Sequence, residues 1–392
     1  MNPFAGMPMF GDLAKALAGQ GPLNWDAARQ FAALSSTGGT SESNVDPAVR
    51  IAYAGLAEIA EMHVRDVTGL DTPRASLELT TPGAYAQRTL DAYRPLFTEL
   101  AVSLGRPPEL ADHGDDAADE TGSGTDPMMA MMAGLSQMLA PSMMGMAIGS
   151  MVGRLSTRAF GQYDLPIPRA GATTSLLLIP SSVDTFADEW SLPVDEMRLW
   201  VLAQELIGHV VFSHASVRDA VTLLVQRHVG AFRADPASVA EKLTSLDVGD
   251  ENPFEAIQSA LSDPEILLGA VRSPEQIRMA PLLEAAIAAV VGYVDYMVDA
   301  VAVRVIGGDA LRIAEAVRRR RIEASAEDVF IERLLGLQVT SSLVQRGKTF
   351  IGGVVDRAGE GALGRLFTVA DGLPTPPELD APGLWLARLD LS

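Results

Sequence analysis

The chain has 392 residues, of which 48% are hydrophobic and 20% charged, so its composition predicts a globular protein with a large buried core. A net charge of −20 disfavours nucleic acid as a partner, because phosphate binding needs clustered lysine and arginine. There is no cysteine, which excludes disulfides, thiol catalysis and cysteine-ligated metal sites. The first residues lack the basic and apolar regions of a signal peptide, so we expect a cytoplasmic protein.

Residues 1–104 form a predicted N-terminal helical region. Asn24 or Asp26 can cap a first helix, and a polar residue followed by proline at 46–47 and 81–82 is typical of two further helix starts. The helix predicted from 82 continues to residue 100. In the helix that begins near 47, apolar residues recur at spacings of three and four and predict one buried face, made by Ile51, Ala54, Leu56, Ile59, Met62 and Val67.

Two unusual segments follow. Residues 105–127 carry seven acids and one arginine among glycine, serine and threonine, and we expect a flexible acidic linker. Residues 127–153 contain no charged residue and many methionines. Their length would allow a membrane span, but Pro141 divides the run and Leu, Ile and Val are scarce. We therefore favour a buried helical hairpin over residues 128–160 and treat membrane contact as the weaker alternative.

The remainder, residues 128–392, is predicted to be one mainly helical domain. The stretch 174–180, TSLLLIP, is the clearest strand, so the fold class is mainly α with a small strand element. A tail beyond the prolines near 374–377 is expected to pack Leu384 and Trp385 on the body. Helices are predicted over 193–214, 216–231, 236–245, 274–306, 309–322, 325–336 and 338–358.

A run of four arginines, residues 318–321, ends one of these helices. Cations are favourable at a helix C-terminus, so we interpret the run as a solvated helix end, with an anionic partner as the weaker alternative.

The stretch 199–212, LWVLAQELIGHVVF, has the rhythm of a zinc-peptidase helix. Such a helix places two histidines at i and i+4 on the metal and a glutamate beside the first as general base. With Gln204 and Gly208 in the ligand positions, Glu205 is the base but both imidazoles are missing. With Glu205 and His209 as ligands, Leu206 stands in the base position. Spacing alone favours a core helix in which Glu205 pairs with Arg198 or His209.

Several stretches together resemble an actinobacterial zincin-like family of zinc-dependent metallopeptidases or hydrolases whose function is not established. They agree in order and spacing from about residue 20 to 390, and the resemblance implies a zincin-like helical metallopeptidase fold. The stretches are GPLNWDAARQFA, AFGQYDLPIP, LLLIPSSVDTFADEWSLPVDEMRLWVLAQELIGHVVF, GYVDYMVDAV and EAVRRRRIEAS.

The resemblance also implies which residues stand at the metal site. Gln204 and Gly208 occupy the places of the two histidine ligands, and Glu205 keeps the place of the general base. Further on, Val291 replaces an acidic residue that is a plausible third ligand, and Tyr296 replaces a histidine. Glycine and valine cannot bind zinc through a side chain and glutamine is a poor ligand, so the resemblance implies a degenerate motif, a lost zinc and a vestigial Glu205.

Three functions remain open at this stage. The first is a catalytically inactive homologue, a pseudoenzyme without a cofactor, that acts as a binding or regulatory protein on a protein partner such as an active paralogue. The second is a metallopeptidase or hydrolase with a rebuilt metal site, in which His209, Asp295 and Asp299 join Glu205. The third is a membrane anchor formed by the methionine-rich hairpin.

Overall fold

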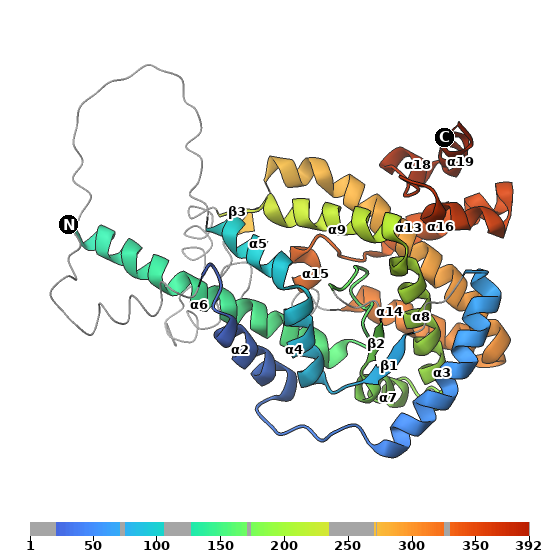
Figure 1. The fold of residues 1–392 in the computed structure, drawn as a ribbon, viewed down its shortest axis with the longest axis horizontal. Helices are drawn as coiled ribbons and strands as arrows, with labels where there is room; N and C mark the ends of the chain where they lie inside the picture. The colour runs from blue at the N-terminus through green and yellow to red at the C-terminus, as the bar shows by residue number, and fades with distance from the viewer. Residues whose placement is uncertain are drawn as a thin grey trace.

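The computed structural model describes residues 21–70, 75–105, 127–170, 174–234, 270–271, 273–324 and 330–391, with the backbone alone for residues 127–138, 234 and 270–271. Nearly all of the expected acidic linker and the helix predicted over 236–245 lie outside these residues. The described part is mostly helical, as predicted, with two small two-stranded sheets (Figure 1).

The helices, in chain order, are α2 (Trp25–Thr37), α3 (Pro47–Thr68), α4 (Pro82–Ala92), α5 (Arg94–Leu104), α6 (Pro127–Arg158), α7 (Pro180–Glu189), α8 (Val194–Ser213), α9 (Ala215–Gly230), α13 (Pro274–Val305), α14 (Ala310–Glu323), α15 (Phe330–Leu334), α16 (Ser341–Ala358), α17 (Arg365–Thr368), α18 (Pro376–Asp380) and α19 (Pro382–Leu391), with the 3₁₀ turns η1 (Gly307–Asp309) and η2 (Glu360–Gly364). The strands are β1 (Ser76–Leu79), β2 (Ser175–Leu178), β3 (Arg233–Ala234) and β4 (Ala270–Val271). The long helices predicted beyond residue 193 are thus confirmed as α8, α9, α13, α14 and α16.

The strand predicted over 174–180 is confirmed as β2, and it has a partner that the sequence analysis missed. β1 pairs with β2 in parallel, with Leu77 opposite Leu176. On the antiparallel side of β2, Gly161 forms a bridge with Leu178. The main chain after α6 is thereby fixed beside β2, and it runs on toward the middle of α8.

Two predictions about the N-terminal helices are wrong. The helix expected over 82–100 is divided into α4 and α5 at Tyr93. Pro95 has no N–H and its ring clashes with the carbonyl four residues earlier, so a new helix starts instead. The face expected to be buried on α3 is largely exposed, with Ile51 at 75% and Met62 at 59% exposure. α3 is a surface helix that turns Tyr53, Ala60 and Val64 toward α8 and α13.

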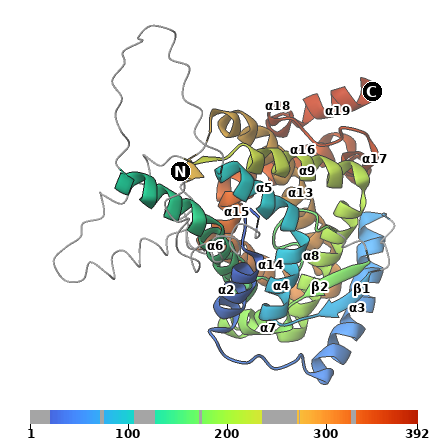
Figure 2. The same cartoon turned by 60° about the vertical axis from the view of Figure 1, so that its left-hand side comes forward.

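The methionine-rich segment forms the single helix α6 and not the expected hairpin. A proline inside a helix removes one hydrogen bond and displaces one carbonyl, which bends the helix without reversing the chain. The carbonyl of Pro141 accepts a hydrogen bond from the main-chain N–H of Asn24, at 3.0 Å. The C-terminal part of α6 packs along α2. The N-terminal part of α6 projects from the body of the protein in both views (Figures 1 and 2).

The contact between α2 and α6 depends on glycines that let the two backbones touch. A Cβ atom on Gly149 would lie 2.2 Å from the carbonyl oxygen of Ala28. We expect Gly149→Ala to lower the free energy of unfolding by about 1–3 kcal/mol, the usual cost of an overpacked contact. Gly55 in α3 is the matched control, because a Cβ there meets nothing within 4 Å. Gly55→Ala should stabilise by roughly 0.5–1 kcal/mol in the same urea titration. Equal effects of the two substitutions would contradict this account.

The core is built around α8 and α13, which pack against each other. Within the described residues, α13 is the one helix long and apolar enough to cross a membrane, but 67% of its apolar window is buried inside the protein. Its composition is therefore explained by its central place in the fold. At the C-terminus, Trp385 is fully buried as expected and its indole donates to the carbonyl of Gly372, whereas Leu384 is 56% exposed because it lies on the outer face of α19.

Candidate functional site

The middle of α8 carries the residues that the sequence analysis selected. Gln204, Glu205, Gly208 and His209 are all buried. A helix that is apolar on every side must lie in the core, and the four residues are therefore surrounded by protein on all faces. Acidic residues in the first turn of α8, Asp195 and Glu196, suit the positive end of its dipole.

Three of the four positions assigned to metal ligands meet at one cavity. Gln204 and Gly208 of α8 and Val291 of α13 line a cavity of about 40 Å³, together with Asp295. Tyr296 lies elsewhere, and its hydroxyl donates to Glu360 at 2.7 Å. A volume of this size holds about one or two water molecules and is far below the few hundred Å³ of a typical ligand pocket.

Tyr163 occupies the space beside Gly208. A Cβ atom on Gly208 would lie 2.9 Å from Cγ of the Tyr163 ring and 3.1 Å from its Cβ. The ring stacks on Phe212 and its hydroxyl lies 3.0 Å from Nδ1 of His209, within hydrogen-bonding distance. Any side chain at position 208 would therefore require Tyr163 to move.

Glu205 is fully buried. Spacing alone predicted that it pairs with Arg198 or His209, but it does not pair with Arg198. Its Oε2 accepts a hydrogen bond from the main-chain N–H of Tyr163 at 2.9 Å. Arg198 instead binds Asp184. Burial, and then the charge of Asp164, raises the pKa of the Glu205 carboxyl well above its usual range. Gly161 lets the carboxyl fit, because a Cβ there would lie 2.5 Å from Cδ of Glu205.

Three neighbouring polar atoms on α8 are buried without a hydrogen-bond partner among the described residues. They are Oε1 of Gln204, Oε1 of Glu205 and Nε2 of His209. Burial also lowers the pKa of His209. Oε1 of Gln204 and Oε1 of Glu205 are both acceptors when the carboxyl is ionised. A proton on the Glu205 carboxyl would supply a donor there, which agrees with its raised pKa.

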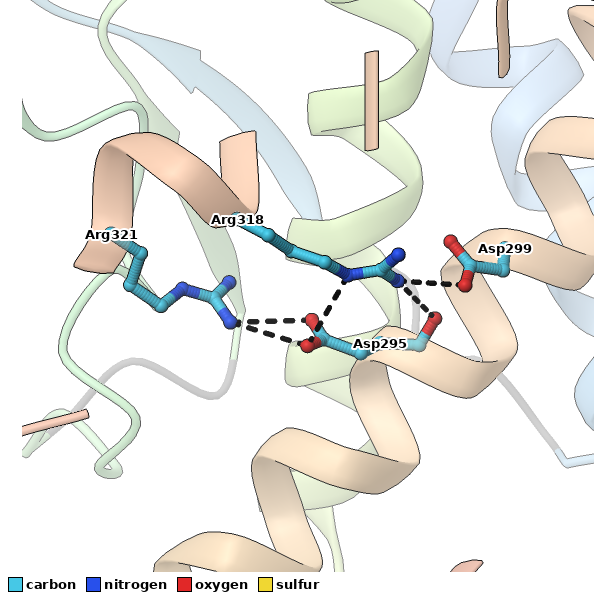
Figure 3. Close-up of polar contacts among 4 residues, drawn as sticks. All are labelled: Asp295, Asp299, Arg318 and Arg321. Atoms are coloured by element: carbon cyan, nitrogen blue, oxygen red, sulfur yellow. Dashed lines mark hydrogen bonds and ion pairs between the residues drawn. The ribbon is translucent and has the colours of Figure 1, made fainter. Parts of the chain in front are cut away.

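Asp295 and Asp299 of α13 are held by arginines of α14 (Figure 3). Nη1 of Arg321 lies 3.3 Å from both carboxylate oxygens of Asp295. Nη2 of Arg318 lies 2.7 Å from Asp299, and its Nε lies 3.7 Å from Asp295. Both carboxylates therefore already have cationic partners.

These contacts correct the prediction that the arginine run is a solvated helix end. Only Arg319 of the four is exposed, where it pairs with Glu323. α14 packs across α13 and α8, and this tertiary contact draws the other three arginines inward.

The family model of the zincin-like metallopeptidases matches residues 23–386. The chain belongs to this family.

A solved structure supports the fold of this zincin-like chain. It is a crystal structure from Chloroflexus aurantiacus, described as "a putative hydrolase with a novel fold", with 20% sequence identity and a TM-score of 0.62. The similarity covers 94% of this chain and 99% of that one. At this identity the likeness shows the fold alone. No curated protein matches the chain.

A zincin implies a metal ion, but the side chains at this site do not fit zinc. Zinc sites in proteins take cysteine, histidine or carboxylate ligands, and a catalytic site needs three of them. At the assigned ligand positions the cavity offers an amide from Gln204, no side chain from Gly208 and an alkyl group from Val291. Two carboxylates also line it, but Asp295 pairs with Arg321 and Asp164 accepts from the main-chain N–H of Phe160, and two are fewer than a catalytic zinc site needs. Within the described residues, no group of three or more His, Asp or Glu side chains is placed to hold a metal ion.

The sequence analysis assigned no role to Tyr163 and Asp164 and interpreted Arg321 as part of a solvated helix end, but all three line the cavity. The stretch AFGQYDLPIP was part of the family resemblance, and this was the available signal for the first two. Nothing in the sequence indicated that Tyr163 lies against Gly208, because the contact joins residues far apart in the chain.

Proposed function

We propose that this protein is a zincin-like family member that has lost its metal centre and acts by binding another protein. The observation that carries the proposal is the cavity of about 40 Å³ where Gln204, Gly208 and Val291 stand at the positions assigned to the metal ligands. The two carboxylates that also line it already have partners, because Asp164 accepts from the main-chain N–H of Phe160 and Asp295 pairs with Arg321. The Tyr163 ring fills the space that a ligand at position 208 would need.

The state of Glu205 supports the same proposal. A general base in a metallopeptidase must be ionised and must reach a metal-bound water. Here the carboxyl of Glu205 is fully buried, and this burial is the main cause of its raised pKa. A raised pKa favours the protonated carboxyl, which cannot accept a proton, so Glu205 suits a structural role.

The proposed partner is a protein, such as an active paralogue of the same family, in the cytoplasm. The acidic surface, with a net charge of −20, supports a protein over a nucleic acid. Light scattering of equimolar mixtures with such a paralogue tests this part, and two separate species at micromolar concentration would contradict it.

The main test is the metal content of the purified, untagged full chain, measured by mass spectrometry. We expect zinc far below one ion per chain, and the same value in the Glu205→Gln variant. Near-stoichiometric zinc that falls in this variant would overturn the proposal.

The second candidate is a hydrolase with a rebuilt metal site at Glu205, His209, Asp295 and Asp299. It is favoured by the buried, unpartnered Oε1 of Glu205 and Nε2 of His209. Against it, both aspartates are bound to arginines. Zinc that is lost in both Glu205→Gln and Asp299→Asn would support this candidate, whereas zinc that is unaffected by Asp299→Asn would contradict it.

A further inference from the structure

A second cavity, of about 220 Å³, adjoins the small one and shares Asp164, Arg321 and Val339 with it. Three arginines line this second cavity: Arg158 from α6, and Arg320 and Arg321 from α14. Two carboxylates, Asp164 and Glu332, face them. The described wall is therefore positive by one charge, in a protein whose net charge is −20.

Arg320 differs from the other arginines of this region. Its guanidinium stacks over the Phe160 ring, 3.7 Å from the centroid, and lies 5.4 Å from that of Phe186. It donates to the main-chain carbonyl of Arg158. In the described part of the chain it forms no ion pair with a carboxylate, whereas Arg158 pairs with Glu332 and Arg321 with Asp295.

Arg320 is desolvated, and the charges of Asp164 and Glu189 act on it without forming an ion pair. Burial, as the largest cause, lowers the pKa of Arg320 to about 10. The side chain still carries its proton at neutral pH, and the two phenyl rings hold it in place. A fixed, partly desolvated guanidinium that lines a cavity binds an oxyanion with little loss of side-chain entropy.

The start of α16 contributes to the same cavity. Thr340 and Ser341 line it, and α16 begins at Ser341 and is 18 residues long. The Thr340 hydroxyl caps the main-chain N–H of Leu343, at 3.2 Å. The positive end of the helix dipole therefore adds to the charge of the arginines, and the Ser341 hydroxyl is a further donor to an anion.

We propose that this arginine-lined cavity binds the phosphate group of a small ligand. A phosphate group presents several acceptor oxygens, which suits donors that come from α6, α14 and α16. A volume of about 220 Å³ suits a small phosphate ester and not a polymer. Arg320 also lines a wider pocket of about 650 Å³ beside Phe186 and Trp190, which gives the ligand room beyond its phosphate. The site is independent of whether a metal binds at α8.

Inorganic phosphate is the probe, and the full-length chain is titrated by calorimetry at constant ionic strength. We expect binding that weakens by more than about tenfold in Arg320→Met, since charge-assisted hydrogen bonds are lost. The matched control is Arg319→Met, one residue earlier on α14, where the exposed side chain pairs with Glu323. It should bind phosphate as the natural protein does.

Arg320→Lys distinguishes weaker binding from a folding defect, because lysine keeps the charge but lacks the planar set of donors of the guanidinium. We expect a folded protein, by circular dichroism, that binds phosphate several-fold more weakly. No heat of binding to the natural protein would overturn the proposal. So would equal losses in Arg319→Met and Arg320→Met, or tighter binding of acetate than of phosphate, which would point to a carboxylate ligand.

Discussion

We expect the Glu205→Gln variant to be more stable than the natural protein at pH 8 and to lose this advantage as the pH falls toward 5. Burial, followed by the charge of Asp164, raises the pKa of Glu205 well above its usual range in the folded protein. In the unfolded chain the same carboxyl titrates near its ordinary pKa of about 4.3. Folding therefore requires the carboxyl to stay protonated, or to be ionised in an apolar place.

The direction of the pH effect follows from these two pKa values. Because the folded pKa is the higher, the contribution of Glu205 to stability is fully present below the unfolded pKa. It is lost as the pH rises toward and through the folded pKa, by about 1.4 kcal/mol for each pH unit in that window. Glutamine has no proton to lose, and its carbonyl oxygen can still accept from the N–H of Tyr163, which lies 2.9 Å from Oε2 in the natural protein.

Urea unfolding of both proteins from pH 5 to pH 9 gives the difference in free energy at each pH, in which other titrating groups cancel. Glu378→Gln is a contrasting control. Burial alone would raise the pKa of Glu378, but hydrogen bonds from Arg388 and Thr375 lower it overall. Its substitution should therefore destabilise by nearly the same amount from pH 5 to pH 9, because this stabilisation is lost only as the pH falls below the unfolded pKa of about 4.3. A Glu205 difference that does not change with pH would mean that the folded protein holds this carboxylate ionised, as a bound cation would.

The elements that carry the site could be predicted because their sequence patterns are long and strongly apolar. Long, mostly apolar runs predict α8 and α13, and the family resemblance assigned Gln204, Gly208 and Val291 on them to ligand positions. The structure brings these three residues to one cavity. β1 escaped prediction because it has four residues and contains Glu78, so that it gains its structure only from pairing with β2.

The contacts that give the site its chemistry could not be predicted, because they depend on which distant residues approach α8 and α13. A glycine at position 208 leaves a space, but the sequence does not say that Tyr163 fills it. Likewise the arginine run resembles any basic helix end until the packing of α14 brings Arg318 and Arg321 to Asp295. Periodicity identifies a buried face, whereas the partner of that face is set by the tertiary fold.

We expect zinc binding in a variant that has both zinc ligands at the assigned positions and the space for them. We expect the variant Gln204→His, Gly208→His, Val291→Glu and Tyr163→Gly to bind about one zinc ion per chain, since a catalytic zinc site needs three protein ligands. Removal of the Tyr163 side chain is essential, because its Cγ lies 2.9 Å from the place of a Cβ on residue 208. Zinc content is measured by mass spectrometry after dialysis.

The variant that keeps Tyr163 separates the two requirements. It has the same three ligands, but the histidine at 208 meets the ring, so we expect much weaker binding or a loss of stability. A variant that keeps Val291 should bind at least roughly 100-fold more weakly, since losing even a partner of a ligand costs about 10–100-fold. If the four-residue variant folds but binds no zinc, then positions 204, 208 and 291 do not form the family's metal site. If the natural protein binds zinc as tightly as this variant does, the natural protein still has a metal centre.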